Sequence, residues 1–507
     1  MLLTLLSLLA IPVGYYLLIE LKGFLRIRRY KRQGIKMAEH QTLPAAYSKG
    51  KASGLSEPLA ESKRKMKEQD PDQPFWVTNF GSTCLVTLVS EKAINEFYAK
   101  ETEVCVKPNP LKKRTNLRFF GFLLDNGKEV QKKRAVFAKI FHYSNVLNLM
   151  AGIRKVIRQH VAKLKKWAEA EGGRLKIDLR EKFSRALLDD LTACILLGGT
   201  ENKLVDRFDG MTVTEVIQKM VMVFNAYARN PLKIIPFSSK LELVKEEKEL
   251  RRLQKGLTNI VRKEYNKRYN QKDLSEESVI DIMVKLNKES EKEAGKPKFS
   301  VEEISSNFEL FHFAASDTSF HLSSSTLAYL ALPENEKYQK RIQAEIDSEL
   351  GASDSYSNEK LNSLEELNRV FRETTRIANP ATSITRIVTK DFKLEGYTVY
   401  KGDVLTNPLL NFEPGLYKDP LEFNPDRFNT HNPNFKKAPK LKQIPFSHGQ
   451  RGCLGKYLGE MMVKLIVVEL LKEFEVSVEP GYVMKFGFVP VFTVTNPDLV
   501  LEVRRGQ

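Results

Sequence analysis

The stretch FSHGQRGCLG, residues 446–455, decides the fold of this chain. Its spacing is Phe-x-x-Gly-x-Arg-x-Cys-x-Gly, and it places Cys453 in a glycine-bounded turn just before a segment of helical character. Glycines let a backbone approach a flat group closely and leave N–H groups free to point at a sulfur atom. The stretch therefore suits a cysteine thiolate that is bound to the iron of a heme.

The neighbouring side chains fit the same purpose. Arg451 can neutralise a heme propionate through a charge-assisted pair, and Phe446 can cover the thiolate side of the ring. Gly449 and Gly455 let the backbone come close to the ring. An isolated cysteine is more often an ordinary buried side chain. The five matched positions of this stretch favour the ligand over that alternative.

With this stretch the chain resembles the cytochrome P450 family of heme-thiolate monooxygenases, and the resemblance runs in the family's order from about residue 75 to the C-terminus. It implies a heme b cofactor with Cys453 as the axial ligand of the iron. It also implies an α+β, mainly helical fold with small β-sheets. We find no flavin-binding segment, so we expect electrons from NADPH through a separate flavoprotein reductase or a cytochrome b5-like donor.

Composition indicates the compartment and the binding partners to expect for this protein. The chain has 507 residues, a formal net charge of +18 and four cysteines that are scattered without CxxC spacing. That cysteine usage argues against a disulfide scaffold or a zinc site, and it indicates a reducing compartment. No nucleic-acid motif accompanies the basic charge, so we expect a membrane surface and an acidic protein partner, and no nucleic acid.

The N-terminus predicts a membrane anchor. Residues 2–21 are apolar over the length of a bilayer-spanning helix, Glu20 is their only charge, and a basic block follows at once. A cleaved signal peptide is the alternative, but it usually carries charge before its apolar run. We therefore expect one transmembrane helix at 2–21, a basic juxtamembrane segment and linker at 22–70, and the monooxygenase domain at 71–507. The anchor predicts a single-pass protein of the endoplasmic reticulum membrane with its catalytic domain in the cytoplasm.

Apolar periodicity predicts helices in the middle of the chain and strands at both ends. The clearest helical stretches are Val146–Glu171, Glu242–Asn270 and Val301–Leu332. Strand patterns occur at Phe75–Asn79, Cys84–Val89, Ser383–Val388, Tyr397–Val399 and Met484–Leu501.

The stretch AASDTS, residues 314–319, matches the family's Ala/Gly-Gly-x-Asp/Glu-Thr-Thr/Ser pattern. The resemblance implies that Thr318 lies beside the oxygen-binding face of the heme and that Asp317 supplies or relays protons. A threonine within a helix often only bonds back to a carbonyl group, which is the alternative for Thr318. Ala315 stands where the family usually has glycine. We therefore expect its methyl group to reduce the space in the oxygen-binding groove or for the substrate above the heme. We assign no role to the nearby His312 and His321.

A second pattern predicts a buried ion-pair network. Glu373 and Arg376 lie three residues apart on one helical face, as in the family's Glu-x-x-Arg. The resemblance implies that Arg427 joins them, and that the three residues are structural rather than catalytic. Asp426 stands where the family usually has glutamate.

Two further arginines match positions at which the family binds heme propionates. Arg386 lies in a predicted strand, and Arg134 matches the arginine of Trp-x-x-x-Arg, with Val130 at the tryptophan position. Arg134 is equally well explained as a solvated basic residue.

The resemblance also implies where substrate and reductase bind. An apolar pocket for a lipophilic molecule would use Phe119, Phe120, Phe122, Phe308, Phe311, Ile384 and Phe486, although each phenylalanine can equally be core packing. The segment Asn230–Phe237 is apolar and basic, and we expect it to dip into the membrane. A basic surface for an acidic reductase would use Lys132, Lys133, Lys139, Lys436, Lys437, Lys440, Lys442 and Lys456.

Three functions stay open at this point. The first is a monooxygenase that inserts one atom of O2 into a lipophilic substrate. The second is an enzyme of the same fold that isomerises or dehydrates a hydroperoxide, against which the Asp317–Thr318 pair argues. The third is a heme-binding protein without catalytic turnover.

Overall fold

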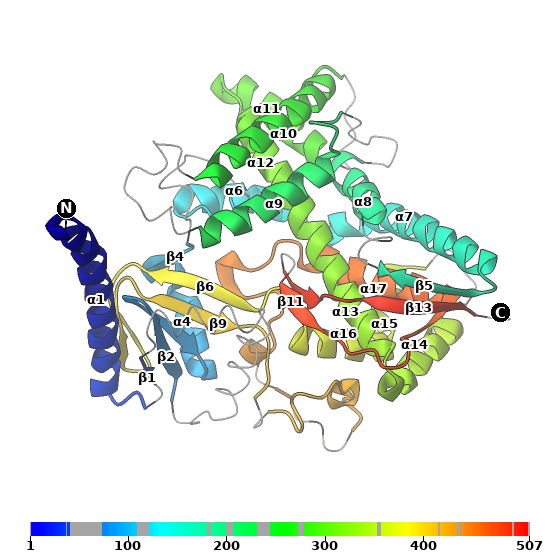
Figure 1. The fold of residues 1–507 in the computed structure, drawn as a ribbon. Coiled ribbons are helices and arrows are strands. Elements are labelled where there is room, and N and C mark those ends of the chain that lie inside the picture. Colours follow the sequence, from blue (N-terminus) through cyan, green and yellow to red (C-terminus); the bar gives the residue numbers. More distant parts are fainter. Residues whose placement is uncertain are drawn as a thin grey trace. The chain divides into compact units, whose positions relative to one another are not determined.

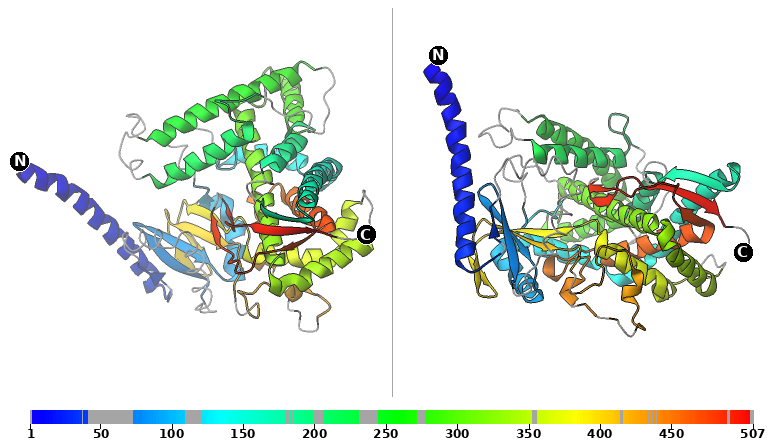
Figure 2. Two further views of the ribbon diagram at one scale, coloured as in Figure 1. Left: turned by 45° about the vertical axis from the view of Figure 1, so that its right-hand side comes forward. Right: turned by 60° about the horizontal axis from the view of Figure 1, so that its bottom comes forward.

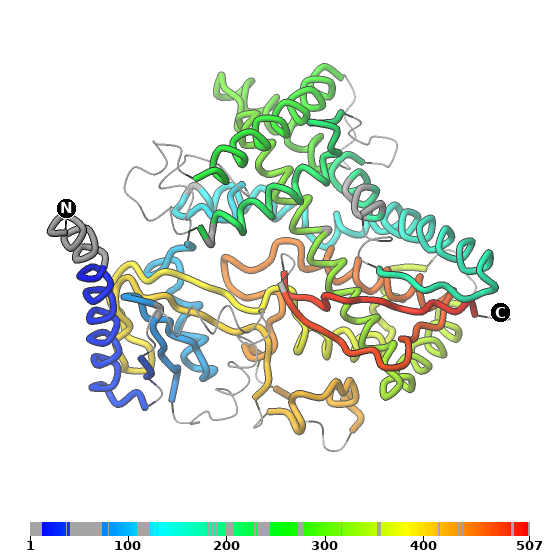
Figure 3. Tube along the Cα trace, in the orientation of Figure 1, coloured from blue at the N-terminus to red at the C-terminus, as the bar shows by residue number. Residues whose placement is uncertain are grey.

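The computed structural model describes residues 2–36, 38–40, 73–108, 121–179, 183, 185–198, 206–230, 244–271, 278–351, 356–413, 416–432, 435, 437–438, 440–488 and 491–504. The chain forms two compact units. Unit 1 comprises residues 1–108, 375–423 and 430–453, and unit 2 comprises 109–374, 424–429 and 454–507. Unit 1 thus combines the blue N-terminal segment with yellow and orange segments from late in the chain (Figure 3).

Unit 1 is built on a six-stranded sheet with strand order β1-β2-β3-β9-β6-β4. The strands are β1 (Ala38–Glu39), β2 (Phe75–Phe80), β3 (Thr83–Leu88), β4 (Cys105–Val106), β6 (Ser383–Val388) and β9 (Val404–Pro408). Strands β2 and β3 pair antiparallel around Gly81, whose φ is +58°, whereas β3 and β9 pair parallel with Leu85 opposite Val404. A separate hairpin joins β7 (Phe392–Leu394) to β8 (Tyr397–Val399).

Two helices pack on this sheet. Helix α1 (Leu2–Arg32) contacts β1, β2 and β3, and Figure 2 shows it beside the sheet from two further sides. The buried side chains of Ile27 and Tyr30 belong to one apolar core with the sheet. Gly23 permits this approach, because a Cβ there would lie 2.3 Å from the carbonyl oxygen of Gly81. Helix α4 (Glu91–Val104) begins at Ser90, whose hydroxyl accepts a bond from the N–H of Ala93.

Across the part of the chain that the structure describes, no helix combines the length and the apolar character that crossing a membrane requires. The anchor at 2–21 and the division at residue 71 stay predictions.

Unit 2 is mainly helical. Its helices are α6 (Lys128–Ile140), α7 (Tyr143–Ala170), α8 (Arg185–Leu197), α9 (Val213–Arg229), α10 (Lys245–Tyr269), α11 (Val279–Ala294), α12 (Val301–His312), α13 (Thr318–Leu330), α14 (Glu336–Glu349), α15 (Asn358–Ser363) and α17 (Lys456–Glu473). Helix α16 (Glu365–Ile377) crosses the boundary between the units after Thr374.

The core of unit 2 lies around α17, which contacts α7, α13 and α14. Most side chains of α17 between Leu458 and Leu471 are buried, as expected of a helix that is apolar on nearly all sides. Beside these helices lie a three-stranded sheet and a hairpin (Figure 1). The sheet orders β10 (Phe474–Ser477), β13 (Asp498–Val503) and β5 (Arg174–Asp178), and the hairpin pairs β11 (Phe486–Phe488) with β12 (Phe492–Val494).

These elements confirm the predicted α+β, mainly helical class with small sheets. The predicted strands from Phe75–Asn79 to Tyr397–Val399 and the helices predicted at Val146–Glu171 and Glu242–Asn270 are present within a few residues of their expected bounds. The strand region predicted at Met484–Leu501 forms three strands, β11, β12 and β13, and the helix predicted at 2–21 continues to Arg32. The predicted helix over Val301–Leu332 is interrupted by a π-helical turn, η4 (Phe313–Asp317), between α12 and α13. Single π-turns inside α-helices are frequent at functional sites.

Candidate functional site

Cys453 lies in a loop of unit 1 that is closed by a hydrogen bond between two backbone groups of the loop. The N–H of Cys453 donates to the carbonyl oxygen of Phe446 at 2.9 Å, and the 3₁₀ turn η8 (Gly449–Arg451) lies between them. Ser447 and Gly449 both have positive φ, +63° and +72°. Cys453 is exposed, whereas the other three cysteines are buried. The loop therefore presents one accessible thiol to a ligand.

Helix α4 supports this loop from within unit 1. The hydroxyl of Tyr98 lies 3.2 Å from that of Ser447 and accepts a bond from Asn407 at 3.1 Å. The ring of Tyr98 also meets the ring of His448 edge-on at 5.5 Å. Sequence reasoning missed Tyr98, because nothing in its local sequence indicates that α4 packs against a loop about 350 residues later.

Arg386 is held by an acidic partner. On β6, its guanidinium pairs with the carboxylate of Glu101 on α4 at 2.5 Å, and both side chains are buried. Nη1 of Arg386 also donates to the carbonyl oxygen of Thr385 at 2.8 Å. A carboxylate therefore already engages the predicted propionate-binding arginine.

Thr318 and Asp317 lie where the π-turn η4 gives way to α13 in unit 2. The hydroxyl of Thr318 donates to the carbonyl oxygen of Ala314 at 2.7 Å, the back-bond that was the alternative to a functional role. A hydroxyl that donates one bond keeps two lone pairs as acceptors. Thr318 can therefore bond back to its helix and still accept a bond from a bound molecule.

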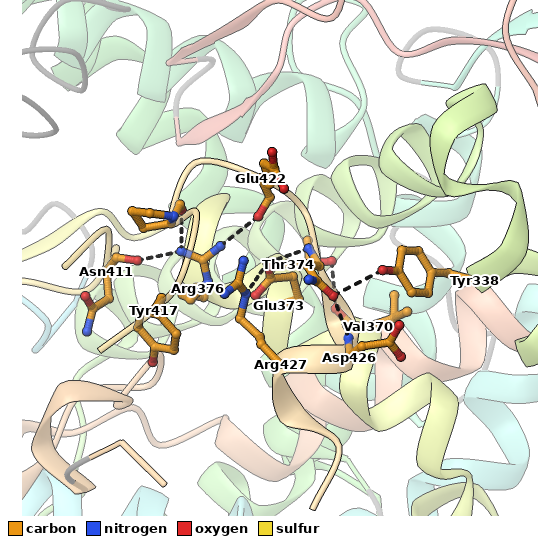
Figure 4. Close-up of polar contacts among 12 residues, drawn as sticks. Tyr338, Val370, Glu373, Thr374, Arg376, Asn411, Tyr417, Glu422, Asp426 and Arg427 are labelled. Atoms are coloured by element: carbon orange, nitrogen blue, oxygen red, sulfur yellow. Dashed lines mark hydrogen bonds and ion pairs between the residues drawn. The ribbon is translucent and has the colours of Figure 1, made fainter. Parts of the chain in front are cut away.

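The predicted network around Glu373 and Arg427 is present as a buried pair in unit 2 (Figure 4). The carboxylate of Glu373 accepts from Nε of Arg427 at 3.0 Å and from the N–H of Asn424 at 2.8 Å. The Glu373 side chain is fully buried, and that of Arg427 is 8 % exposed. The pair fixes the short turn η6 (Pro425–Phe428) to helix α16.

Arg376 binds backbone groups within unit 1. Its guanidinium donates to the carbonyl oxygens of Asn411 and Pro420 at 2.7 Å and of Glu422 at 3.2 Å, and it lies 5.0 Å from the ring centre of Tyr417 (Figure 4). These bonds attach the loop after β9 to helix α16, and the participation of Arg376 in the carboxylate network stays a prediction.

Comparison with known proteins decides the family, because the family model described as "Cytochrome P450" matches residues 54–501. The chain belongs to the cytochrome P450 family. The P450 is similar to secologanin synthase 1 of Catharanthus roseus, with 25% identity over 70% of this chain and 67% of the relative. It is also similar to a sterol 14alpha-demethylase of Mycolicibacterium vanbaalenii, with 26% identity over 62% of this chain and 66% of the relative.

A solved structure shows the same fold. The retinoic acid-bound cyanobacterial CYP120A1 matches this P450 with a TM-score of 0.68 at 18% identity, over 87% of this chain and 94% of the other. The family consists of heme-thiolate enzymes, so the protein is an oxidoreductase of the monooxygenase class and its cofactor is heme.

The residues of the P450 fit such a cofactor. Its loop offers a single accessible thiol, that of Cys453. A heme iron is already held by its macrocycle and needs only such a ligand from the protein on this side.

The predicted site residues divide between the units. Cys453, Arg386, Phe446, Gly449 and Arg451 belong to unit 1, whereas Asp317, Thr318, Arg134 and Gly455 belong to unit 2. Arg134 is buried on α6 and Val130 is buried one turn earlier, while Gly455 caps the start of α17.

Several phenylalanines expected to line the pocket pack against other aromatic rings. Phe122 stacks on Phe137 with ring centres 5.1 Å apart, and Phe311 meets both rings. Phe308 is buried, and Phe486 stacks on Phe492 at 5.3 Å. Core packing therefore accounts for Phe122 and Phe311. Phe119, Phe120 and most of the predicted membrane-dipping segment, residues 231–237, lie outside the described residues.

Proposed function

We propose that this P450 inserts one atom of O2 into a lipophilic small molecule, with Cys453 as the axial ligand of the heme iron. The observation that carries the proposal is the exposed thiol of Cys453 in a loop closed by its own backbone bond to Phe446. When bound, the heme supplies the oxygen chemistry, and thiolate ligation favours O–O cleavage.

The remaining residues have roles that their surroundings support. Thr318 would accept a hydrogen bond on the oxygen-binding side while its own O–H group donates to the carbonyl oxygen of Ala314. Asp317, next in the chain, would take up and release protons through its carboxyl group. Both residues lie at the π-turn, where the helix departs from regular α geometry.

Arginines would hold the propionates. Arg451 and Arg134 would each offer a charge-assisted bond. Arg386 would share its donors between a propionate and Glu101, which its five N–H groups allow.

Electrons would come from NADPH through a separate flavoprotein reductase or a cytochrome b5-like donor. Within the predicted docking surface, Lys133 pairs with Glu303 and Lys442 pairs with Glu413. Lys132 and Lys139 on α6 are exposed, so we propose that these two lysines attract the acidic partner. The apolar segment 2–21 supports a single-pass anchor in the endoplasmic reticulum membrane with a cytoplasmic catalytic part.

The test is the carbon monoxide difference spectrum of the dithionite-reduced protein. Wild type and a Cys194→Ser control should both show the strongly red-shifted Soret band of thiolate ligation, because Cys194 is buried. Cys453→Ser should lose that band. A histidine-type band in folded wild type, or an unchanged band in Cys453→Ser, would refute the assignment.

A further inference from the structure

Asp317 has a histidine partner one helical turn further on, within unit 2. Nε2 of His321 lies 3.5 Å from Oδ1 of Asp317, and the two side chains are 6 % and 15 % exposed. Nδ1 of the same ring lies 3.1 Å from the hydroxyl of Thr493 on β12, which is fully buried. His321 therefore connects the π-turn that carries Asp317 to the C-terminal hairpin.

The chemistry of the three groups allows a chain of hydrogen bonds between them. A carboxylate oxygen accepts hydrogen bonds, so Oδ1 of Asp317 can accept from Nε2 of His321 in the tautomer that carries a proton on Nε2. In that tautomer Nδ1 of the neutral ring is an acceptor, to which the hydroxyl of Thr493 can donate. The contact with Thr493 holds the ring in the orientation that it presents to Asp317.

The second carboxylate oxygen of Asp317, Oδ2, has different surroundings from Oδ1. Oδ2 is buried, and it has no hydrogen-bond partner in the part of the protein that the structure describes. A buried acceptor without a partner costs about 1–3 kcal/mol, and such groups are often kept for catalysis or for an ordered water. One oxygen of Asp317 thus faces His321 at 3.5 Å, while the other has no hydrogen-bond partner among the described residues.

We propose that His321 is a positioning residue for proton delivery: it holds Oδ1 of Asp317 so that Oδ2 exchanges protons with water on the side of Thr318. The inference rests on the proposed function. The alternative is that His321 only packs inside unit 2, where its ring also lies 5.8 Å from that of Phe320. An i,i+4 pair on an exposed helix would contribute little, but here the histidine is buried, the aspartate is largely covered, and the ring contacts a second element.

Two substitutions separate the alternatives. In His321→Gln the side-chain amide reaches the place of Nε2 and can still donate to Asp317. In His321→Asn the amide reaches only the place of Nδ1, so it keeps Thr493 and loses Asp317. Both variants lose the ring, so a packing role predicts similar effects, whereas a positioning role predicts that only the asparagine variant is impaired.

The first measurement is NADPH-driven O2 consumption with an added flavoprotein reductase, in H2O and in D2O. His321→Asn should slow it on the order of tenfold and change the solvent isotope effect, because general acid–base groups contribute 10²–10⁴-fold. His321→Gln should stay within about twofold of wild type. The second measurement is the infrared stretch of carbon monoxide bound to the reduced protein, which should shift in the asparagine variant only.

The outcomes are distinct. Equal behaviour of the two variants in both measurements would overturn the role of His321. If either variant fails to fold, Thr493→Val replaces the pair, and O2 consumption unchanged from wild type in this variant would also overturn it. Failure of the proposed function itself would appear in wild type, as a missing thiolate-type carbon monoxide band.

Discussion

The hydroxyl of Tyr30 on α1 donates to Oδ2 of Asp403 at 2.7 Å, joining residues 373 positions apart. The other carboxylate oxygen of Asp403 lies 3.2 Å from Nη1 of Arg26 and accepts from the N–H of Cys84 at 3.3 Å. Burial raises the pKa of Tyr30 and of Asp403. The basic half of α1, expected to belong to a juxtamembrane linker, is therefore bonded to the sheet of unit 1.

This bond predicts a stability difference between two tyrosines of α1. Tyr30→Phe should lower the free energy of unfolding of unit 1 by about 1–2 kcal/mol, because Asp403 loses a buried donor. Tyr15→Phe is the matched control, since Tyr15 is 57% exposed and should change nothing. Urea unfolding followed by circular dichroism measures both, and equal midpoints would show that the bond contributes no stability.

The pair between Glu373 and Arg427 should be needed for folding and heme uptake. Glu373→Gln leaves a buried guanidinium without its counter-charge, so we expect a loss of about 3–5 kcal/mol and a lower heme content per chain. Arg341→Ala is the control, because its ion pair with Asp426 at 2.7 Å is substantially exposed and should contribute less than about 1 kcal/mol. Similar losses in both variants would contradict this ranking.

Thr318 should determine how much of the NADPH consumed is lost as hydrogen peroxide. In Thr318→Val the hydroxyl is lost at nearly constant volume, and we expect a several-fold rise in hydrogen peroxide released per NADPH consumed, on the order expected for a lost proton-handling group. Thr326→Val is the control, because Thr326 makes the same back-bond, to Leu322 at 2.8 Å. A rise in the control alone, or in neither variant, would refute the role of Thr318.

Reductase docking should depend on exposed lysines of α6. Lys132→Glu/Lys139→Glu should slow reductase-supported turnover and weaken its dependence on salt, because steering by opposite charge is lost. Peroxide-supported turnover should be unchanged, and so should both activities of Lys296→Glu, which lies in an exposed loop. Equal loss of the two activities in the double variant would instead indicate damage to the fold.

Alkaline pH should destabilise unit 1 through Cys105. Burial, with the nearby charge of Glu101, raises the pKa of the Cys105 thiol from 9.0 to about 12. Because the folded pKa is the higher one, this stabilisation is complete below about pH 9 and is lost as the pH rises toward about 12. Urea unfolding under reducing conditions should show a pH slope that is shallower in Cys105→Ala, by up to about 1.4 kcal/mol per pH unit. Parallel slopes would contradict the raised pKa.

Local sequence patterns were sufficient to predict much of the fold and part of the candidate site. The strands at Ser383–Val388 and Tyr397–Val399 were predicted with their observed bounds, because alternation along a strand is a local property. The Glu373–Arg427 pair could be expected from two short motifs. The π-turn at Phe313–Asp317 could not, since regular apolar spacing continues on both sides of it.

The sequence by itself determined the family, the heme-ligating cysteine that we propose, and the residue types around it, because these depend on spacing along a short stretch of chain. Only the tertiary structure decided which partners those residues meet. In the structure Arg386 pairs with Glu101, Arg376 donates to backbone carbonyl groups, and His321 contacts Thr493. Such contacts join segments that are far apart in the chain, and the packing of whole elements, rather than any local pattern, brings their side chains within bonding distance.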